Sequence, residues 1–266
     1  IAARHGRPAV GKQDFLDAID RIVGGLENRS KVIKVSEKKA IAYHEAGHAV
    51  ITKLLPSQDP VHQISIIPRG RAGGYTLSLP KEDKYYAAKS EMLDEIVVFL
   101  GGRVAEKIVL NDISTGASND IERASAMVRQ MVTKYGMSDR IGPISFGSAH
   151  DEVFLGRDFT TSKNFSEEIA SMIDREVKQI IDDAYVKCEE MLRAHMKELT
   201  AVAEYLIKYE SMDGETFERL FSGEEVDAPP HKVSFFTPET KAEAVREEHA
   251  AKEEGSDALP PLNEQH

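Results

Sequence analysis

The 266-residue sequence contains a single cysteine, no tryptophan and few aromatic residues, 7% in all. One cysteine, Cys188, excludes an internal disulfide framework and a zinc site built from cysteines, and it fits a reducing compartment. The shortage of aromatic residues favours a mainly helical architecture over a β-sandwich. No run of about 18 apolar residues occurs and no signal peptide is recognisable, so we expect any membrane anchor to lie outside this chain.

Positive charge is also scarce, because 34 lysine and arginine residues face 45 aspartate and glutamate residues, a net charge of -11. A nucleic-acid-binding protein needs a basic face to neutralise phosphates, so the charge argues against this class and we expect no nucleic-acid partner. The acidic excess is concentrated in residues 223–266, where eleven acidic and four basic residues give 4 − 11 = −7. This segment is rich in proline and can bury little apolar surface, so we expect a disordered tail.

Hydrophobic residues make up 41% of the chain, which is enough for a buried core. We expect Ser36 to cap the helix that contains most of the chemistry, and Gly24 and Gly25 to end the helix before it. The spacing of apolar residues predicts helices over 12–23, 36–55, 86–110, 118–135, 162–206 with a break, and 213–221, and strands over 61–67 and 74–79. The predicted fold is therefore mainly α, with a small β-sheet edge beside the helix of residues 36–55.

That helix carries the pentapeptide HEAGH at residues 44–48, an instance of HExxH. Positions i and i+4 share a helix face, so His44 and His48 can bind one metal ion while Glu45 reaches the water that the metal activates. Zinc lowers the pKa of water from 15.7 to about 7, and Glu45 can act as the general base that takes its proton. The alternative is a chance match on a surface helix. Gly47 costs about 1 kcal/mol in a helix interior, and a close approach by another element would explain its presence.

A catalytic zinc site usually has three protein ligands, and HEAGH supplies two of them. Leu54 occupies the position of the third histidine in HExxHxxGxxH, which argues against a metzincin. Two downstream carboxylates are candidates: Glu106 in LGGRVAE (100–106) and Asp120 in STGASND (114–120). An aspartate in the first turn of a helix is often only a cap, and Glu106 could be solvated. The residues alone leave the choice open.

In their order and spacing these segments resemble the FtsH family of membrane-anchored AAA+ zinc metalloproteases. The resemblance covers about residues 1–221 and rests on HEAGHA, ISIIPRG (64–70), GG (73–74), LGGRVAE, STGASND and VFLGR (153–157).

The resemblance implies roles for individual residues. His44, His48 and Asp120 would be the zinc ligands, Glu45 the base, and Glu106 a candidate for the group that hydrogen-bonds a ligand imidazole and fixes its tautomer. The family also implies a strand at the edge of the cleft that pairs with the main chain of an unfolded substrate. Its candidate residues are Gly73, Gly74, Tyr75 and Thr76.

The resemblance also implies the organisation of the chain: the end of an ATPase helical lid (1–25), a linker (26–35), a zinc metallopeptidase domain (36–222) and the acidic tail (223–266). Residues 6–13, GRPAVGKQ, nearly match the phosphate-binding GxxxxGK[ST], but Gln13 replaces the hydroxyl that coordinates Mg²⁺ and no apolar strand precedes the match. We therefore expect no nucleotide site in this chain.

What the family implies for the full-length protein is one Zn²⁺ per chain, ATP and Mg²⁺ only in an upstream ATPase module, a membrane anchor and a homohexamer. The domain would lie on the cytoplasmic side, or on the matrix or stroma side in an organelle, and degrade unfolded or misassembled polypeptides. Two rivals remain: an inactive structural ring, and a zinc-dependent interaction module, which would need a closed site with four ligands.

Overall fold

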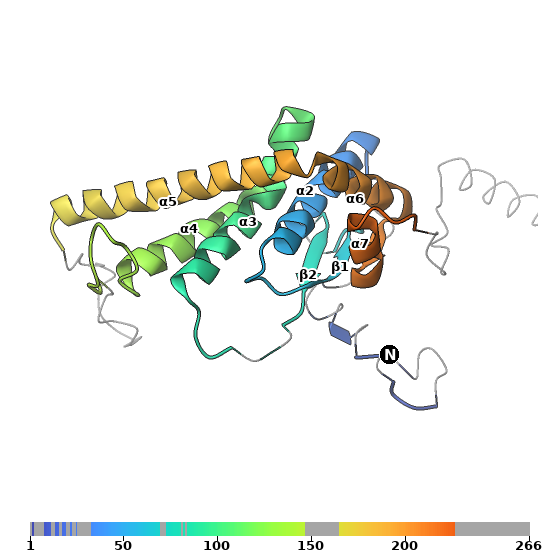
Figure 1. Ribbon diagram of the computed structural model, residues 1–266, viewed down its shortest axis with the longest axis horizontal. Helices are drawn as coiled ribbons and strands as arrows, with labels where there is room; N and C mark the ends of the chain where they lie inside the picture. Colours follow the sequence, from blue (N-terminus) through green and yellow to red (C-terminus); the bar gives the residue numbers. More distant parts are fainter. Residues whose placement is uncertain are drawn as a thin grey trace, which may run out of the picture. The chain divides into compact units, whose positions relative to one another are not determined.

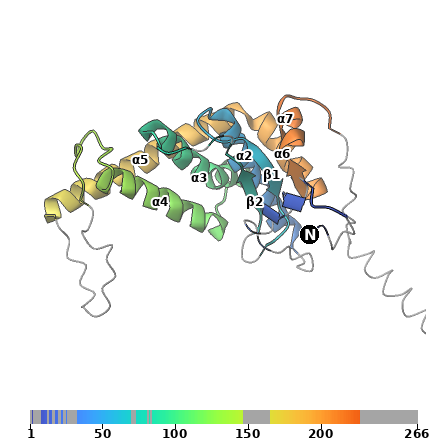
Figure 2. The same cartoon turned by 90° about the horizontal axis from the view of Figure 1, so that it is seen from below.

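The computed structural model describes residues 33–69, 73–80, 84–146 and 165–226, together with Glu82 and a few residues before position 26. This part of the chain consists of helices α2 to α7 and one three-stranded antiparallel sheet (Figures 1 and 2). The mainly α fold with a small sheet, predicted from the sequence, is confirmed. Among the described residues no helix combines the length and the apolar character needed to span a bilayer.

Helices α2 (Val35–Leu54) and α3 (Lys89–Leu110) pack tightly against each other, and α2 is buried without interruption over residues 42–52. A β-carbon built on Gly47 would lie 2.4 Å from the carbonyl oxygen of Gly101, and one on Gly101 would lie 2.9 Å from the carbonyl oxygen of Gly47. The two backbones are therefore in contact at these glycines. This is the close approach that Gly47 led us to expect.

The sheet has the order β2-β1-β3, with β1 (Val61–Ser65) between β2 (Tyr75–Ser78) and β3 (Ser211–Asp213). Ile64 in the central strand is fully buried. Strand β2 lies at an edge of the sheet and also contacts α2. The sheet therefore has an edge strand next to the helix that carries HEAGH, as the sequence predicted.

The remaining helices enclose this centre. A short 3₁₀ helix, η2 (Thr115–Ala117), leads directly into α4 (Ser118–Thr133), and the long α5 (Glu167–Ala194) packs along α3 and α4 (Figure 1). Helix α6 (Met196–Tyr209) packs on α2, and α7 (Gly214–Phe221) packs on α6 and the sheet. These contacts fix α2 from several sides.

Some predicted helix ends are confirmed and others are wrong. Ser36 does not cap α2: the helix begins one residue earlier, and Lys34 precedes it without a side-chain cap. The predicted break in 162–206 is confirmed at His195, which separates α5 from α6. Ser166 caps α5 by accepting a hydrogen bond from the backbone N–H of Ile169.

Two further differences concern short segments. Helix α3 begins at Lys89 and not near residue 86, because the Glu91 carboxylate accepts a hydrogen bond (2.9 Å) from the backbone N–H of Ala88 and fixes the first turn there. The sequence did not predict strand β3, because three residues are too few to show the alternation of apolar and polar residues that marks a strand. Most of the predicted helix over 12–23 and all of residues 227–266 lie outside the described residues.

Candidate metal centre

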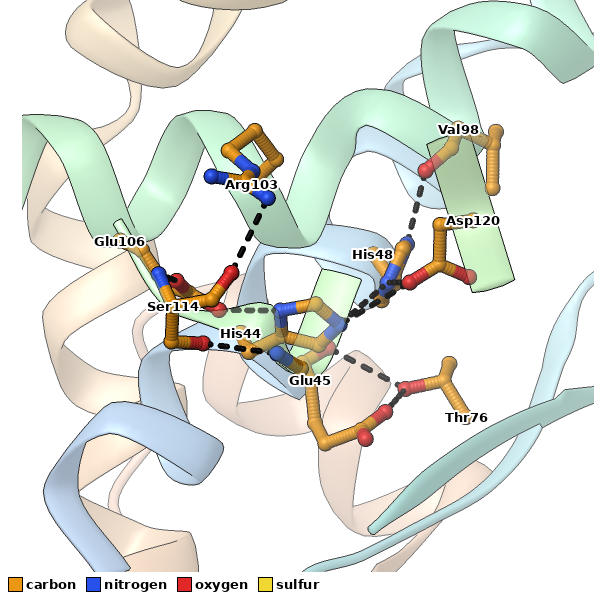
Figure 3. Close-up of polar contacts among 10 residues, drawn as sticks. His44, Glu45, His48, Thr76, Val98, Arg103, Glu106, Ser114 and Asp120 are labelled. Carbon is orange, nitrogen blue, oxygen red and sulfur yellow. Dashed lines mark hydrogen bonds and ion pairs between the residues drawn. The ribbon is translucent and has the colours of Figure 1, made fainter. Parts of the chain in front are cut away.

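The two histidines of HEAGH lie one turn apart on the buried face of α2 and project in the same direction (Figure 3). The Nε2 atoms of His44 and His48 are 3.1 Å apart, and the rings meet edge to face with centroids 4.7 Å apart. Each residue is only 9% exposed. The i, i+4 spacing therefore brings two ring nitrogens to one point, as the motif predicted.

Asp120 reaches the same point from a different helix. Helix α3 ends at Asn111 in the left-handed conformation, and the following loop and η2 turn the chain back so that the first turn of α4 faces α2. Asp120 Oδ2 lies 3.3 Å from His44 Nε2 and 3.6 Å from His48 Nε2. Of the two carboxylates left open by the sequence, Asp120 is the one that joins both histidines.

The hydrogen bonds behind the imidazoles determine which nitrogens carry protons. His48 Nδ1 lies 2.7 Å from the carbonyl oxygen of Val98, and because a carbonyl only accepts, Nδ1 must be the donor. His44 Nδ1 lies 2.7 Å from Glu106 Oε1, which likewise accepts. In the neutral rings both Nε2 atoms are therefore lone-pair acceptors that face each other and Asp120.

Glu106 lies behind His44 and outside the group of three acceptors (Figure 3). It is 2% exposed, and its second oxygen, Oε2, accepts a hydrogen bond of 2.8 Å from the backbone N–H of Ser114. Arg103 donates to the carbonyl oxygen of Ser114 at 3.0 Å. Burial raises the pKa of Glu106, but the hydrogen bonds from His44 and Ser114 outweigh it and leave that pKa below its ordinary value. Glu106 is thus placed to orient His44 as an ionised carboxylate.

Three acceptors that converge without a donor between them need a cation, and their spacing suits zinc. Ligands at 2.0–2.1 Å from a tetrahedral Zn²⁺ are about 3.3 Å apart. The three observed separations of 3.1, 3.3 and 3.6 Å fall around this value. Two neutral imidazoles and one carboxylate are also a common donor set for catalytic zinc. The residues present therefore fit a zinc ion.

The ionisation of these groups shows how strongly the site favours positive charge. Burial lowers the pKa of His44, but the hydrogen bonds with Asp120 and Glu106 outweigh it and raise the pKa to about 10. Burial raises the pKa of Asp120, but the two histidines hold it well below its ordinary value. In the metal-free chain a proton on His44 therefore supplies the positive charge, so protons and metal ions compete for this site.

Helix α3 fits against the histidines because of its paired glycines. A β-carbon on Gly102 would lie 2.4 Å from Cε1 of His44, inside the ring's van der Waals surface. Its neighbour Gly101 contacts the backbone of Gly47 and His48. The LGG segment of LGGRVAE thus lets α3 approach α2 closely enough for Glu106 to reach the His44 ring.

Glu45 lies next to the metal-binding group and is only 6% exposed. Burial raises the pKa of its carboxyl above the ordinary value, and the charges of His44 and His48 and a hydrogen bond from Thr76 oppose this rise. The Thr76 hydroxyl donates to Glu45 Oε2 at 2.8 Å (Figure 3). A β-carbon on Gly74 would lie 2.8 Å from Glu45 Oε1, so only glycine fits there.

The structure thus groups the residues that the sequence singled out. Four of them, Gly73 to Thr76, run along α2: Gly73 packs against Ile41, while Tyr75 stacks its ring under the Arg69 guanidinium at 4.7 Å. Sequence reasoning missed two backbone groups: the carbonyl of Val98, which holds the His48 ring, and the N–H of Ser114, which holds the Glu106 carboxylate behind His44. No side-chain pattern could have identified them, since any residue type presents the same carbonyl and N–H.

The sequence matches the model of peptidase family M41 over residues 31–220. It is 56% identical over 227 residues to the ATP-dependent zinc metalloprotease FtsH 1 of Thermoanaerobacter sp. (strain X514), covering 85% of this chain and 37% of that protein. It is 48% identical over 262 residues to FtsH 2 of Alkaliphilus metalliredigens, covering 96% and 38%, and 48% identical over 225 residues to FtsH of Thermotoga maritima, covering 84% and 37%. Both are also named ATP-dependent zinc metalloproteases. The chain spans less than two fifths of the length of these relatives.

Proposed function

The chain belongs to peptidase family M41, and from this membership we propose that it is a zinc-dependent endopeptidase whose metal ligands are His44, His48 and Asp120. One observation carries the proposal. Both Nδ1 atoms donate hydrogen bonds elsewhere, so two Nε2 atoms and one carboxylate oxygen converge as acceptors beside a buried glutamate. A structural zinc site would be closed by a fourth protein ligand, and among the described residues this group has three.

Each residue of the site has a part in peptide hydrolysis. When bound, zinc supplies Lewis acidity, which polarises a peptide carbonyl and lowers the pKa of water to about 7. Glu45 takes a proton from the attacking water as the new C–O bond forms, and returns it to the amine nitrogen as the C–N bond breaks. Glu106 holds the His44 ring through Nδ1, which keeps Nε2 free for the metal. His48 is held in the same way by the carbonyl of Val98.

The substrate would lie along β2. This strand is at an edge of the sheet, so one side of its backbone has no strand partner among the described residues. Strand β2 also contacts α2, and Thr76 donates a hydrogen bond to Glu45, which supports a substrate strand close to the proposed base. Main-chain pairing there, with Gly73, Gly74, Tyr75 and Thr76 as the contact residues, would accept unfolded polypeptides of many sequences.

The activity of the longer protein is a further part of the proposal. The relatives' names support an ATP-dependent protease, and the chain covers less than two fifths of their length. We infer an ATPase module and a membrane anchor in the full-length protein, a homohexamer, and unfolded or misassembled proteins as substrates. This domain would then lie on the cytoplasmic, matrix or stromal side.

Metal analysis combined with casein cleavage tests the proposed function. The chain should contain one zinc per molecule, cleave unfolded casein, lose activity with a strong chelator and regain it on addition of zinc. Exposed carboxylates bind zinc weakly, so the acidic surface of the chain alone would not retain one zinc ion per molecule. Cleavage that persists at full rate after the metal has been removed would contradict a zinc peptidase.

A further inference from the structure

Thr76 lies where strand β2 meets helix α2, and its hydroxyl faces Glu45. The oxygen Oγ1 is 2.8 Å from Glu45 Oε2 and 3.2 Å from the backbone oxygen of Glu45. A hydroxyl has one proton to donate, and the carboxylate is both the nearer and the charged acceptor. The proton of Thr76 is therefore directed at the carboxylate.

The carboxylate of Glu45 has few other supports. Among the described residues, no other side chain donates a hydrogen bond to it. On the side of Oε1 it meets the backbone of Gly74, the residue before β2, where a β-carbon would be 2.8 Å from Oε1 and 2.9 Å from Cγ. Thr76, a residue of β2, through its hydroxyl, and Gly74, just before β2, through its lack of a side chain, thus determine where the carboxylate lies.

We propose that Thr76 is a positioning residue for Glu45. Thr76 affects hydrolysis only through the Glu45 carboxylate that it orients. This inference rests on the proposed function, in which Glu45 is the general base. A base must lie within hydrogen-bond reach of the proton it takes, and displacement of a reacting group by about 1 Å can cost on the order of 10²-fold in rate. The hydroxyl limits the rotation of the Glu45 side chain and so fixes that reach.

Because Thr76 belongs to β2, the same residue joins the proposed substrate strand to the base. A peptide paired with the outer edge of β2 would be in register with the residue that orients Glu45. The distance from the scissile bond to the base is then set by one short strand of four residues. The contact thus explains a threonine at this position better than β-propensity alone, which valine would satisfy equally well.

Steady-state kinetics of hydroxyl-deletion variants test the inference. Thr76→Val keeps the shape and removes the hydroxyl, and should lower kcat about 10- to 100-fold, the range for loss of a group that orients an active-site residue, with KM changed less than about twofold. Thr76→Ser retains the hydroxyl and should restore most of the lost kcat. Zinc content should remain at one per chain in both variants. Thr133→Val is the matched control, since it removes a hydroxyl that bonds a backbone oxygen at the far end of α4 from Asp120.

A double-variant cycle separates positioning from a structural role. In the Glu45→Gln background, Thr76→Val should cause no further loss, because there is no base left to orient. If the two losses multiply, or if Thr76→Ser is as slow as Thr76→Val, Thr76 acts by another route and the inference is wrong. Should Thr76→Val fold poorly, Thr76→Ala makes the same comparison without a branched side chain.

The same experiment distinguishes this inference from the function on which it rests. If the wild-type chain binds zinc but neither it nor Glu45→Gln cleaves peptide, the proposed function fails and the inference with it. If wild type is active, Glu45→Gln is inactive and Thr76→Val matches wild type, the proposed function stands and only the inference is overturned.

Discussion

Gly47 of α2 and Gly101 of α3 are in backbone contact, so that a β-carbon on Gly47 would lie 2.4 Å from the carbonyl oxygen of Gly101. Residues next to this contact belong to the metal site. His48 directly follows Gly47, and its ring is held by the carbonyl of Val98, three residues before Gly101. The separation of the two helices thus sets the position of the histidine rings.

Replacing Gly47 by alanine should destabilise the fold, although glycine-to-alanine changes within helices usually stabilise it. In an ordinary helix interior, Gly→Ala stabilises by about 1 kcal/mol. Here the methyl group would collide with backbone and push α2 from α3, so we expect a loss of about 1–3 kcal/mol in the free energy of unfolding and weaker zinc binding. Urea unfolding measures the first and a chelator titration the second. Ser171→Ala, on an exposed part of α5, is the control and should change stability by less than about 0.5 kcal/mol.

Glu45→Gln tests the assignment of the base. The amide cannot take a proton from water, so peptide hydrolysis should fall by about 10²- to 10⁴-fold while zinc stays bound. The measurement is kcat/KM on a fluorogenic peptide, with zinc determined on the same sample. Glu122→Gln, an exposed residue on α4, should match wild type. Near-normal turnover in Glu45→Gln would leave the site without a base.

The two candidate carboxylates should respond differently to substitution. Asp120→Ala removes one of three converging acceptors and its negative charge, so the site should lose zinc. Glu106→Gln keeps a group that can accept from His44, so zinc should remain at saturation with an affinity or rate lowered by about 10- to 100-fold. Zinc per chain after dialysis against a weak chelator decides between them. Stoichiometric zinc in Asp120→Ala, with loss in Glu106→Gln, would reverse the two roles.

The metal-free chain should lose stability as the pH rises through the alkaline range. The pKa of His44 is raised from its ordinary 6.5 to about 10 in the folded chain, so its contribution is complete below about pH 6.5 and is lost as the pH approaches 10. Urea unfolding of the metal-free chain at pH 6, 8 and 10 would measure this decline. Asp120→Asn should make it shallower, because that variant removes the carboxylate that holds the His44 proton. An equally steep decline in Asp120→Asn would assign the effect to other groups.

Three residues of the site could be placed from the sequence alone, and a fourth could not. His44, Glu45 and His48 share a face because helical periodicity alone puts them there. Asp120 could not be chosen over Glu106 from spacing, because the choice depends on the turn after α3 at Asn111, where an αL residue redirects the chain. The family resemblance made that choice, and the structure brings Asp120 to the histidines.

Other features depend on contacts that no local pattern encodes. Thr76 was predicted to belong to the strand that pairs with the substrate, and its hydrogen bond with Glu45 arises because β2 packs on α2. Strand β3 forms only because α6 returns the chain to the open side of β1. Such contacts link residues far apart in sequence, so they become visible only when the fold is known.

Ser114 is held at both of its backbone polar groups, by Glu106 at the N–H and by Arg103 at the carbonyl. Asp120 follows six residues later, after a turn of 3₁₀ helix that runs without interruption into α4. Every residue between Ser114 and Asp120 belongs to η2 or α4. One residue inserted into this helical segment would rotate Asp120 by about 100° around the α4 axis. The length of this segment is therefore as much a requirement of the metal site as the identity of its ligands, and evolutionary changes in chain length should fall elsewhere.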